Sequence, residues 1–589
     1  MLKKTVLVIV VAVLPVLNIS VRSQAAADFS VERNVAMKTR DGVMLYADVY
    51  RPAGEGAFPV LLQRTPYNKD KAAPFGHAAA VRGFMVVVQD VRGRYTSEGE
   101  WYPFKHEIED GYDAVEWAAA LPHANGKVGM FGGSYVGATQ MLAAVSHPPH
   151  LAGICPVVTA SNYHENWTYQ GGAFEQWFNQ SWTSGLAQDT FNREIEAGSN
   201  AMIGSKALPL KQYPLFNMQI GADPVGWTAR FAPYYLDWLD HPAYDSYWKQ
   251  WAIEERYSSI QVPALTIAAW YDIFQGGSLK NYLGLKTGAG SDVARAGQRL
   301  MVIVGGHAGN GPKVGAVDFG ADSHFDEDAV TLDWYDYLLL GRQNEFATGK
   351  PVKLFVMGEN KWRDEDGWPL QRAKETHYFL RSGGKANSIS GDGALTTDST
   401  GSGADRYTYD PADPVPTVGG PLCCDSTHLP AGPRDQREVE NRKDVLVYST
   451  GALDQDVEVT GPVTLDLFAK SSAADTDFTA KLVDVWPNGF AQNLTEGILR
   501  ARYRNASTAV RLVPDKVYEY EIDLWATSNV FLKGHRIRLE VSSSNFPRFD
   551  RNLNTGKDAG SSSEFVRAEN TILHDREHPS SLLLPVVPR

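Results

Sequence analysis

The chain has 589 residues, of which 43% are hydrophobic and 21% are charged. That length exceeds the size at which one hydrophobic core stops growing, so we expect two or three domains, and the composition argues against a disordered or fibrous protein. With 56 Lys and Arg against 69 Asp and Glu, the formal net charge is -13, which disfavours nucleic acid and anionic membranes as partners.

The first residues have the three parts of a cleavable signal peptide. Lys3 and Lys4 precede an apolar run over residues 5–17, and small residues follow at positions 25–27. The run is too short to span a bilayer. We therefore expect residues 1–27 to be removed and the chain to be exported to a periplasm or the medium, without a membrane anchor. An ordinary buried N-terminal helix is the alternative.

The next part of the chain alternates between strand and helix patterns. Asp41-Gly42 predicts a hairpin turn, and residues 107–120 have the apolar spacing of a helix. Short continuous apolar runs, typical of strands buried on both faces of a parallel sheet, lie at residues 59–62, 84–88, 128–131, 151–158, 264–269 and 300–304. This order predicts a doubly wound α/β domain over residues 28–160 and 258–350, with active groups beyond the carboxyl ends of the strands.

Two further regions have residue patterns that differ from this alternation of strands and helices. Residues 161–257 are dense in aromatic residues without strand alternation, which predicts a mainly helical cap inserted between two strands. These aromatics either wall a pocket above the sheet or form the core of the cap itself. Residues 351–589 contain many short alternating runs separated by Gly, Pro, Asn and Ser, which predicts an all-β jelly-roll domain.

The chain has three cysteines, too few for a disulfide scaffold. Cys155 lies in an apolar run and is best explained as a small buried hydrophobe. Cys423 and Cys424 are adjacent, so they either close a small ring or remain thiols. Their redox state stays open at this point.

Ser134 is the candidate nucleophile. It follows the predicted strand at residues 128–131 and precedes a small-residue run, which is the strand-turn-helix context of a nucleophile elbow. Gly132 relieves crowding in such a turn, but Val136 stands where the usual second glycine would be and Gly137 comes one place late. A glycine-rich turn without chemistry is the alternative.

A serine hydroxyl needs a base and a group that orients the base. The elbow predicts that the α/β domain is an α/β-hydrolase domain. In the α/β-hydrolase fold, the acid follows a later strand and the histidine follows the last one. Asp272 comes directly after the run at residues 264–269, and His307 comes after the run at residues 300–304. His324 is the fallback base, although it opens a helix pattern. Asp272 and His307 as ordinary loop residues are the competing interpretation.

Two donors are needed for the oxyanion. The residue after the nucleophile usually supplies one through its backbone N–H, which predicts Tyr135. Tyr67, in the loop after the strand at residues 59–62, could supply its hydroxyl. On position alone, Tyr67 could equally pack as a wedge against the cap.

Taken together, these motifs resemble those of the cocaine esterase and X-Pro dipeptidyl peptidase-like family of serine hydrolases. The matching stretches are Arg64-Thr65-Pro66-Tyr67, Asp90-Val91-Arg92-Gly93-Arg94 with Ser97 and Gly99, Gly132 to Gly137, Tyr271-Asp272, His307 and Ser544-Asn545-Phe546-Pro547-Arg548-Phe549. The resemblance implies a helical cap, a jelly-roll domain and a Tyr67 hydroxyl in the oxyanion hole. It also accounts for the displaced Gly137. The Gly305-Gly306 pair departs from the Gly-Pro-Trp common before the histidine in relatives.

The resemblance leaves ester hydrolases, amide-cleaving acylases and X-Pro dipeptidyl peptidases as candidate activities. A substrate with a free ammonium requires nearby carboxylates, yet Ile273, Phe274 and Gln275 follow Asp272. Glu165 and Glu175 in the cap could meet an ammonium, but we expect them to be solvated surface groups. The sequence thus favours a small ester with an uncharged or aryl acyl group over an amide or dipeptide substrate.

The aromatics Trp167, Phe174 and Phe274 are the candidate pocket residues for such a substrate. This chemistry needs neither metal nor cofactor, and we predict none. The physiological substrate and the oligomeric state stay open.

Overall fold

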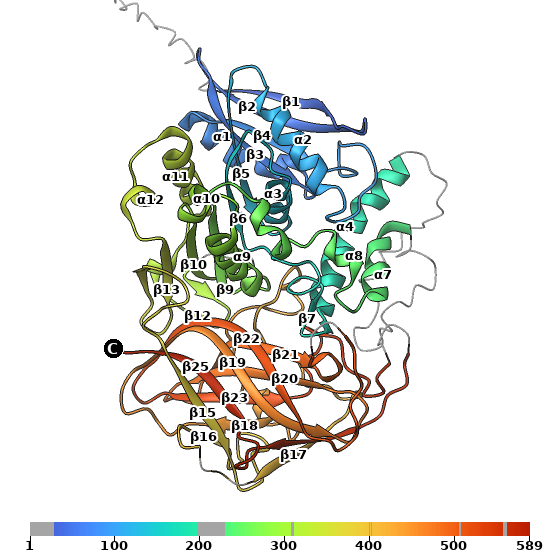
Figure 1. Ribbon diagram of the computed structural model, residues 1–589, viewed down its shortest axis with the longest axis vertical. Coiled ribbons are helices and arrows are strands. Elements are labelled where there is room, and N and C mark those ends of the chain that lie inside the picture. The colour runs from blue at the N-terminus through green and yellow to red at the C-terminus, as the bar shows by residue number, and fades with distance from the viewer. Residues whose placement is uncertain are drawn as a thin grey trace, which may run out of the picture.

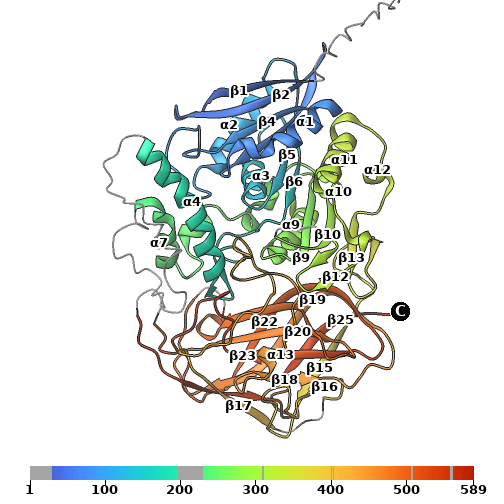
Figure 2. The same cartoon turned by 180° about the vertical axis from the view of Figure 1, so that it is seen from behind.

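The computed structural model describes residues 29–196, 230–307, 311–399, 401, 403–505, 508–557 and 562–589. The predicted signal peptide, residues 1–27, and part of the predicted cap lie outside these ranges. Figures 1 and 2 show an α/β domain stacked on an all-β domain, with the cap helices beside the sheet and reaching the all-β domain. Within the described ranges, no helix is long and apolar enough to cross a membrane.

A ten-stranded sheet with the order β1-β2-β4-β3-β5-β6-β9-β10-β13-β14 forms the first domain. Its central strands β4, β3, β5, β6, β9, β10 and β13 run parallel, and β1, β2 and β14 pair antiparallel at the edges. The strands are β1 (Phe29–Lys38), β2 (Met44–Pro52), β3 (Phe58–Thr65), β4 (Met85–Asp90), β5 (Ala124–Gly133), β6 (Leu151–Val157), β9 (Leu265–Tyr271), β10 (Arg299–Gly306), β13 (Val352–Val356) and β14 (Lys361–Glu365).

Helices cover both faces of this sheet. Successive side chains of a strand point to opposite faces, and in β4 the side chains of Met85 and Val87 join one apolar core while those of Val86 and Val88 join another. Residues of α2 and α3 complete the first core, and residues of α1 and α11 complete the second. The helices of this domain are α1 (Ala73–Arg82), α2 (Glu107–Ala119), α3 (Tyr135–Val145), α9 (Gln275–Gly288), α10 (Asp292–Ala296), α11 (Glu327–Leu340) and α12 (Glu345–Thr348).

The described part of the cap contains helices α4 (Gln176–Glu196), α7 (Pro233–Asp240) and α8 (Ser246–Lys249) and a small hairpin of β7 (Tyr169–Gln170) and β8 (Ala173–Phe174). Its aromatic side chains pack on one another, for example Trp182 on Trp238 with ring centroids 6.1 Å apart. Trp182 therefore contributes to the core of the cap.

The C-terminal domain is all-β, with an eleven-stranded, predominantly antiparallel sheet. Its strands are β15 (Lys374–Arg381), β16 (Ala394–Thr396), β17 (Ala404–Tyr409), β18 (Leu446–Ser449), β19 (Val457–Ser471), β20 (Asp477–Val485), β21 (Ala491–Arg500), β22 (Tyr518–Phe531), β23 (Arg536–Ser542), β24 (Ala568–Leu573) and β25 (Ser581–Val587). The α/β sheet itself continues through β13 and β14, which lie past the predicted boundary after residue 350.

The two domains are joined by hydrogen bonds at the end of β9. The Gln275 side chain donates to the Ala526 carbonyl at 2.8 Å and accepts the Ala526 N–H at 3.1 Å. The Tyr271 hydroxyl donates to the Asn493 carbonyl at 3.1 Å. The loop that carries Asp272 is thus fixed from the side of the all-β domain.

Candidate active site

Ser134 lies at a sharp turn between β5, which ends at Gly133, and α3, which begins at Tyr135. Its backbone has φ 61° and ψ -127°, a conformation that residues with a β-carbon seldom adopt. Gly132 has φ 118°, and a β-carbon there would lie 2.5 Å from Val136 Cγ1, so the turn requires glycine. Although serine is a preferred N-cap residue, the Ser134 hydroxyl does not cap α3. It points instead to His307.

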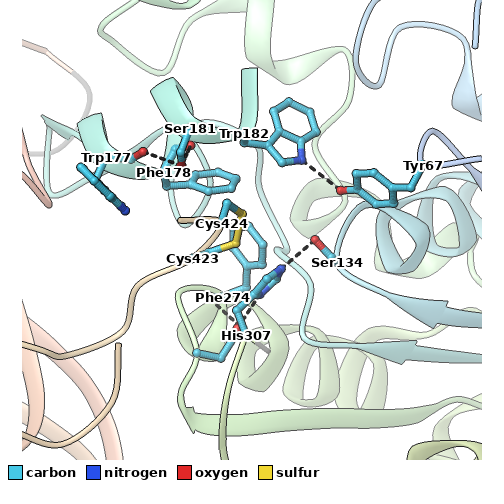
Figure 3. Close-up of a disulfide and its surroundings, with 11 residues drawn as sticks. Tyr67, Ser134, Trp177, Phe178, Ser181, Trp182, Phe274, His307, Cys423 and Cys424 are labelled. Atoms are coloured by element: carbon cyan, nitrogen blue, oxygen red, sulfur yellow. Dashed lines mark hydrogen bonds and ion pairs between the residues drawn. A yellow bond between two sulfur atoms is a disulfide. The ribbon is translucent and has the colours of Figure 1, made fainter. Parts of the chain in front are cut away.

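His307 connects Ser134 to a buried carboxylate. Its Nε2 lies 2.9 Å from Ser134 Oγ and its Nδ1 lies 2.6 Å from Asp272 Oδ2 (Figure 3 shows Ser134 and His307). An ionised carboxylate only accepts hydrogen bonds, so the neutral imidazole that satisfies both contacts carries its proton on Nδ1. Nε2 then accepts the Ser134 hydroxyl proton. The other Asp272 oxygen accepts the Phe274 N–H at 2.7 Å, which fixes the carboxylate.

The Tyr67 phenol also lies beside Ser134. Its oxygen accepts a hydrogen bond from Trp182 Nε1 at 3.0 Å (Figure 3) and also interacts with the Ser134 side chain and the Tyr135 backbone. Burial raises the pKa of the Tyr67 phenol, so it remains a donor at neutral pH. Because the indole N–H can only donate, Trp182 uses an acceptor position of the oxygen and leaves the phenolic proton for another partner.

The Tyr135 side chain turns away from the reacting atoms into the core. Its hydroxyl accepts the Phe104 N–H at 2.8 Å and donates to Glu107 Oε1 at 3.0 Å. Glu107 Oε2 in turn accepts from Arg64 Nη1 at 2.5 Å. This buried chain of polar groups anchors the start of α3 to α2, while the Tyr135 backbone N–H faces Tyr67.

Of the three candidate pocket residues, Phe274 lies beside His307 and Trp167 packs on Phe274. The rings of Trp167 and Phe274 stack with centroids 4.3 Å apart and 8° between planes. The Phe274 ring is also nearly perpendicular to the His307 imidazole, with centroids 5.2 Å apart and 83° between planes. Phe274 thus places an apolar aromatic side chain next to the general-base candidate, and Trp167 packs on its ring.

Phe174 is placed differently. Its ring packs against Tyr169 and Tyr235, with centroids 5.4 and 5.9 Å away, and its backbone N–H donates to Asp550 Oδ1. These contacts make it part of the cap core that faces the all-β domain. The structure therefore does not bring Phe174 to His307.

Three neighbours of the site were not among the predicted site residues. Phe178 and Trp182 are four residues apart in α4, and their rings lie 5.4 Å from Phe274 and 5.5 Å from Trp167, respectively. The i, i+4 spacing places them on one helix face, a signal that was available in the sequence. The third neighbour is Cys423–Cys424, which forms a disulfide between adjacent residues (Figure 3). The sequence alone did not decide whether these two cysteines form a disulfide or remain thiols.

The two candidate acids of the cap are both engaged. Glu175 is buried, and its carboxylate pairs with Arg548 Nη2 at 3.4 Å, so the prediction of a solvated surface group is wrong for this residue. Burial raises its pKa to about 7. Glu165 accepts the Gly171 N–H at 2.8 Å. Among the residues that the structure describes, no group of His, Cys, Asp and Glu has an arrangement that would hold a metal ion.

Comparisons with known proteins cover both domains. The X-Pro dipeptidyl-peptidase (S15 family) model matches residues 41–309, and the X-Pro dipeptidyl-peptidase C-terminal non-catalytic domain model matches residues 344–583. The chain is 40% identical to a cocaine esterase from Rhodococcus sp. (strain MB1 Bresler) over 583 residues, which are 95% of this chain and 99% of that protein.

Solved structures match over the same length. An aminopeptidase from the marine sediment archaeon Thaumarchaeota archaeon has a TM-score of 0.79 at 25% identity, covering 97% of this chain and 99% of that one. An α-amino acid ester hydrolase has a TM-score of 0.80 at 24% identity, covering 96% and 98%. Both share the two-domain architecture described above.

Proposed function

Because the chain belongs to the X-Pro dipeptidyl-peptidase (S15) family and is a carboxylester hydrolase, we propose that it cleaves acyl esters through Ser134, His307 and Asp272. Membership of this family confirms the resemblance that the sequence motifs indicated. The observation that carries the proposal is the continuous hydrogen-bonded chain from Ser134 Oγ through both imidazole nitrogens to the buried Asp272 carboxylate.

In the proposed reaction Ser134 Oγ attacks the ester carbonyl while His307 Nε2 takes the hydroxyl proton. The negative charge on the former carbonyl oxygen is stabilised by the Tyr135 N–H and the Tyr67 hydroxyl. His307 then gives its proton to the departing alcohol, which leaves an acyl-enzyme. A water molecule then attacks the acyl-enzyme through the same steps, with His307 as the base, and the carboxylic acid is released. Throughout, Asp272 holds the imidazole in one tautomer and stabilises the imidazolium.

The proposed acyl group is uncharged or aryl. The aromatic side chain beside His307 is Phe274, which is backed by the stacked ring of Trp167, and such apolar aromatic surroundings suit a planar ring. The carboxylate of Glu175 is already paired with Arg548, and Gln275 turns its amide toward Ala526. An ammonium group held beside His307 would gain no partner from these side chains and would lose its hydration.

A substrate panel tests this choice against the X-Pro dipeptidyl peptidase and amide-acylase alternatives. We compare kcat/KM for an aryl ester of an uncharged acid, the same ester of an α-amino acid, and an Xaa-Pro amide. We expect the uncharged ester to exceed the amino acid ester by at least about tenfold, since an unpaired ammonium in a desolvated site costs more than 1 kcal/mol. A preference for the Xaa-Pro amide would replace the proposal with an exopeptidase.

We also propose that the protein is exported, on the strength of the lysines, apolar run and small residues at positions 1–27. N-terminal sequencing of the protein recovered outside the cytoplasm tests this, with Asp28 as the expected first residue. Recovery from the cytoplasm with Met1 retained would contradict it.

A further inference from the structure

A loop of the all-β domain reaches the candidate active site. Gly420 and Gly432 exchange backbone hydrogen bonds of 2.8 and 2.9 Å and so close the loop at its base. The base is fixed to the α/β domain, because the Ala316 N–H donates to the Pro433 carbonyl at 2.8 Å. The disulfide between Cys423 and Cys424 lies within this loop.

The disulfide has a buried side and an exposed side. Cys423 is 7% exposed and belongs to the apolar core that also contains Trp167, Phe178 and Phe274. Cys424 is exposed. Figure 3 shows the disulfide close to Phe178 and Phe274, across the His307 ring from Ser134. Sulfur is polarizable and packs favourably on aromatic rings.

Cys424 has a backbone conformation that it would seldom adopt alone. Its φ is 78°, in the left-handed region that disfavours residues with a β-carbon. The covalent bond to Cys423 holds the residue there. If the bond opens, both side chains regain their rotations and the backbone at Cys424 is free to relax.

We propose that the Cys423–Cys424 disulfide is a specificity-determining wall of the acyl site, whose closed form favours flat aryl acyl groups and whose reduction removes that preference. This inference rests on the proposed ester hydrolysis at Ser134. A fixed wall keeps its complementarity to a rigid ring, whereas a wall of two mobile thiols admits small and large acyl groups more evenly.

Reduction proceeds by exchange with a dithiol. One thiolate of the reductant attacks the exposed Cys424 Sγ, the bond to Cys423 breaks, and Cys423 leaves as a thiolate that takes a proton. The second thiol of the reductant attacks the mixed disulfide, which frees Cys424 as a thiol and leaves the reductant as a cyclic disulfide. The cysteine pair gains two electrons and two protons, and the dithiol loses the same number.

The third cysteine, Cys155, does not interfere with a test of the Cys423–Cys424 disulfide. It is buried in β6, and burial raises the pKa of its thiol far above the usual range, so it presents almost no reactive thiolate. Replacing it in Cys155→Ala gives a background in which Cys423 and Cys424 are the remaining cysteines.

The experiment compares two aryl esters with one leaving group, a benzoate and an acetate, in the Cys155→Ala background. Enzyme is assayed before and after treatment with dithiothreitol, and native thiol titration counts the sulfhydryls released. We expect the benzoate-to-acetate ratio of kcat/KM to fall about tenfold on reduction, chiefly through KM for the benzoate. Acetate kcat and fluorophosphonate labelling of Ser134 should stay within about twofold.

The double variant Cys423→Ser/Cys424→Ser separates the disulfide from other effects of the reductant. We expect it to have the low ratio of the reduced enzyme and to show no response to dithiothreitol. An unchanged ratio after both thiols are titrated, or a response of the double variant to the reductant, would overturn the inference. Failure of the proposed function itself would show differently, as acetate turnover that survives Ser134→Ala.

Discussion

At the scale of single residues, one acceptor and one donor define where the protons of His307 and Tyr67 point. Asp272 fixes the Nδ1 proton of His307 at 2.6 Å, which makes Nε2 the acceptor for Ser134. Trp182 donates to the Tyr67 oxygen at 3.0 Å, which leaves the Tyr67 proton available to an oxyanion. Both arrangements exist before substrate binds, so little reorganisation is required during the reaction.

Tyr67→Phe removes the proposed hydroxyl donor and keeps the ring. Loss of one oxyanion donor typically costs about 3 to 4 kcal/mol in the transition state, so we expect kcat to fall roughly a hundredfold or more. Steady-state kinetics on an aryl ester measure this. The partly buried Tyr378 of β15 provides a control, since Tyr378→Phe should leave kcat within about twofold. Wild-type kcat in Tyr67→Phe would remove Tyr67 from the mechanism.

The positions of Ser134, Asp272 and His307 could be anticipated because each follows a buried strand of a parallel sheet, and the carboxyl ends of such strands share one edge. Cys423–Cys424 could not be placed in this way. Its position depends on a loop from the other domain and on contacts with residues more than a hundred positions away. No local sequence pattern indicates that the loop with Cys423 and Cys424 lies against these distant residues.

At the scale of elements, the elbow depends on how closely α3 approaches the segment that follows β6. A β-carbon on Gly137 would lie 2.8 Å from Thr159 Cβ, closer than such atoms pack. The glycine that appeared one place late in the motif thus has a packing reason. By contrast, the sequence predicts that the all-β domain begins at residue 351, whereas β13 and β14 pair in the α/β sheet, because short alternating strands have the same pattern in either domain.

Gly137→Ala should push α3 away from Thr159, just after β6. We expect a loss of about 1 to 3 kcal/mol in the free energy of unfolding, as for other overpacked core sites, measured by thermal or denaturant unfolding. Gly185 of α4 is the matched control because nothing lies near its would-be β-carbon. There, Gly185→Ala should stabilise the helix by up to about 1 kcal/mol. Equal stability of Gly137→Ala and wild type would contradict the packing argument.

At the scale of the whole molecule, buried charge joins the cap to the all-β domain. Arg548 lies between two carboxylates, with Nη1 2.5 Å from Glu496 and Nη2 3.4 Å from Glu175. Two acids share one guanidinium in a buried position, so burial raises the pKa of Glu175 to about 7. The sequence motif around Arg548 was recognised, but its partners are distant in the chain and could not be inferred.

This raised pKa makes stability depend on pH. Folded Glu175 binds its proton more tightly than the unfolded chain does, so the free energy of unfolding falls as pH rises from about 4.5 to about 7. Glu175→Gln removes that contribution, and we expect its Tm to fall less than that of wild type over this interval. Glu564→Gln, at an exposed position, should follow wild type. Parallel Tm profiles for Glu175→Gln and wild type would contradict the assignment.

Covalent labelling tests most directly whether Ser134 is the nucleophile. Wild type and Ser134→Ala are treated with a fluorophosphonate, and the adduct is located by peptide mass mapping. We predict one adduct on the peptide that contains Ser134 and none in Ser134→Ala, with ester turnover lost in the variant by several orders of magnitude. Labelling of another residue in wild type, or full turnover in Ser134→Ala, would contradict the account.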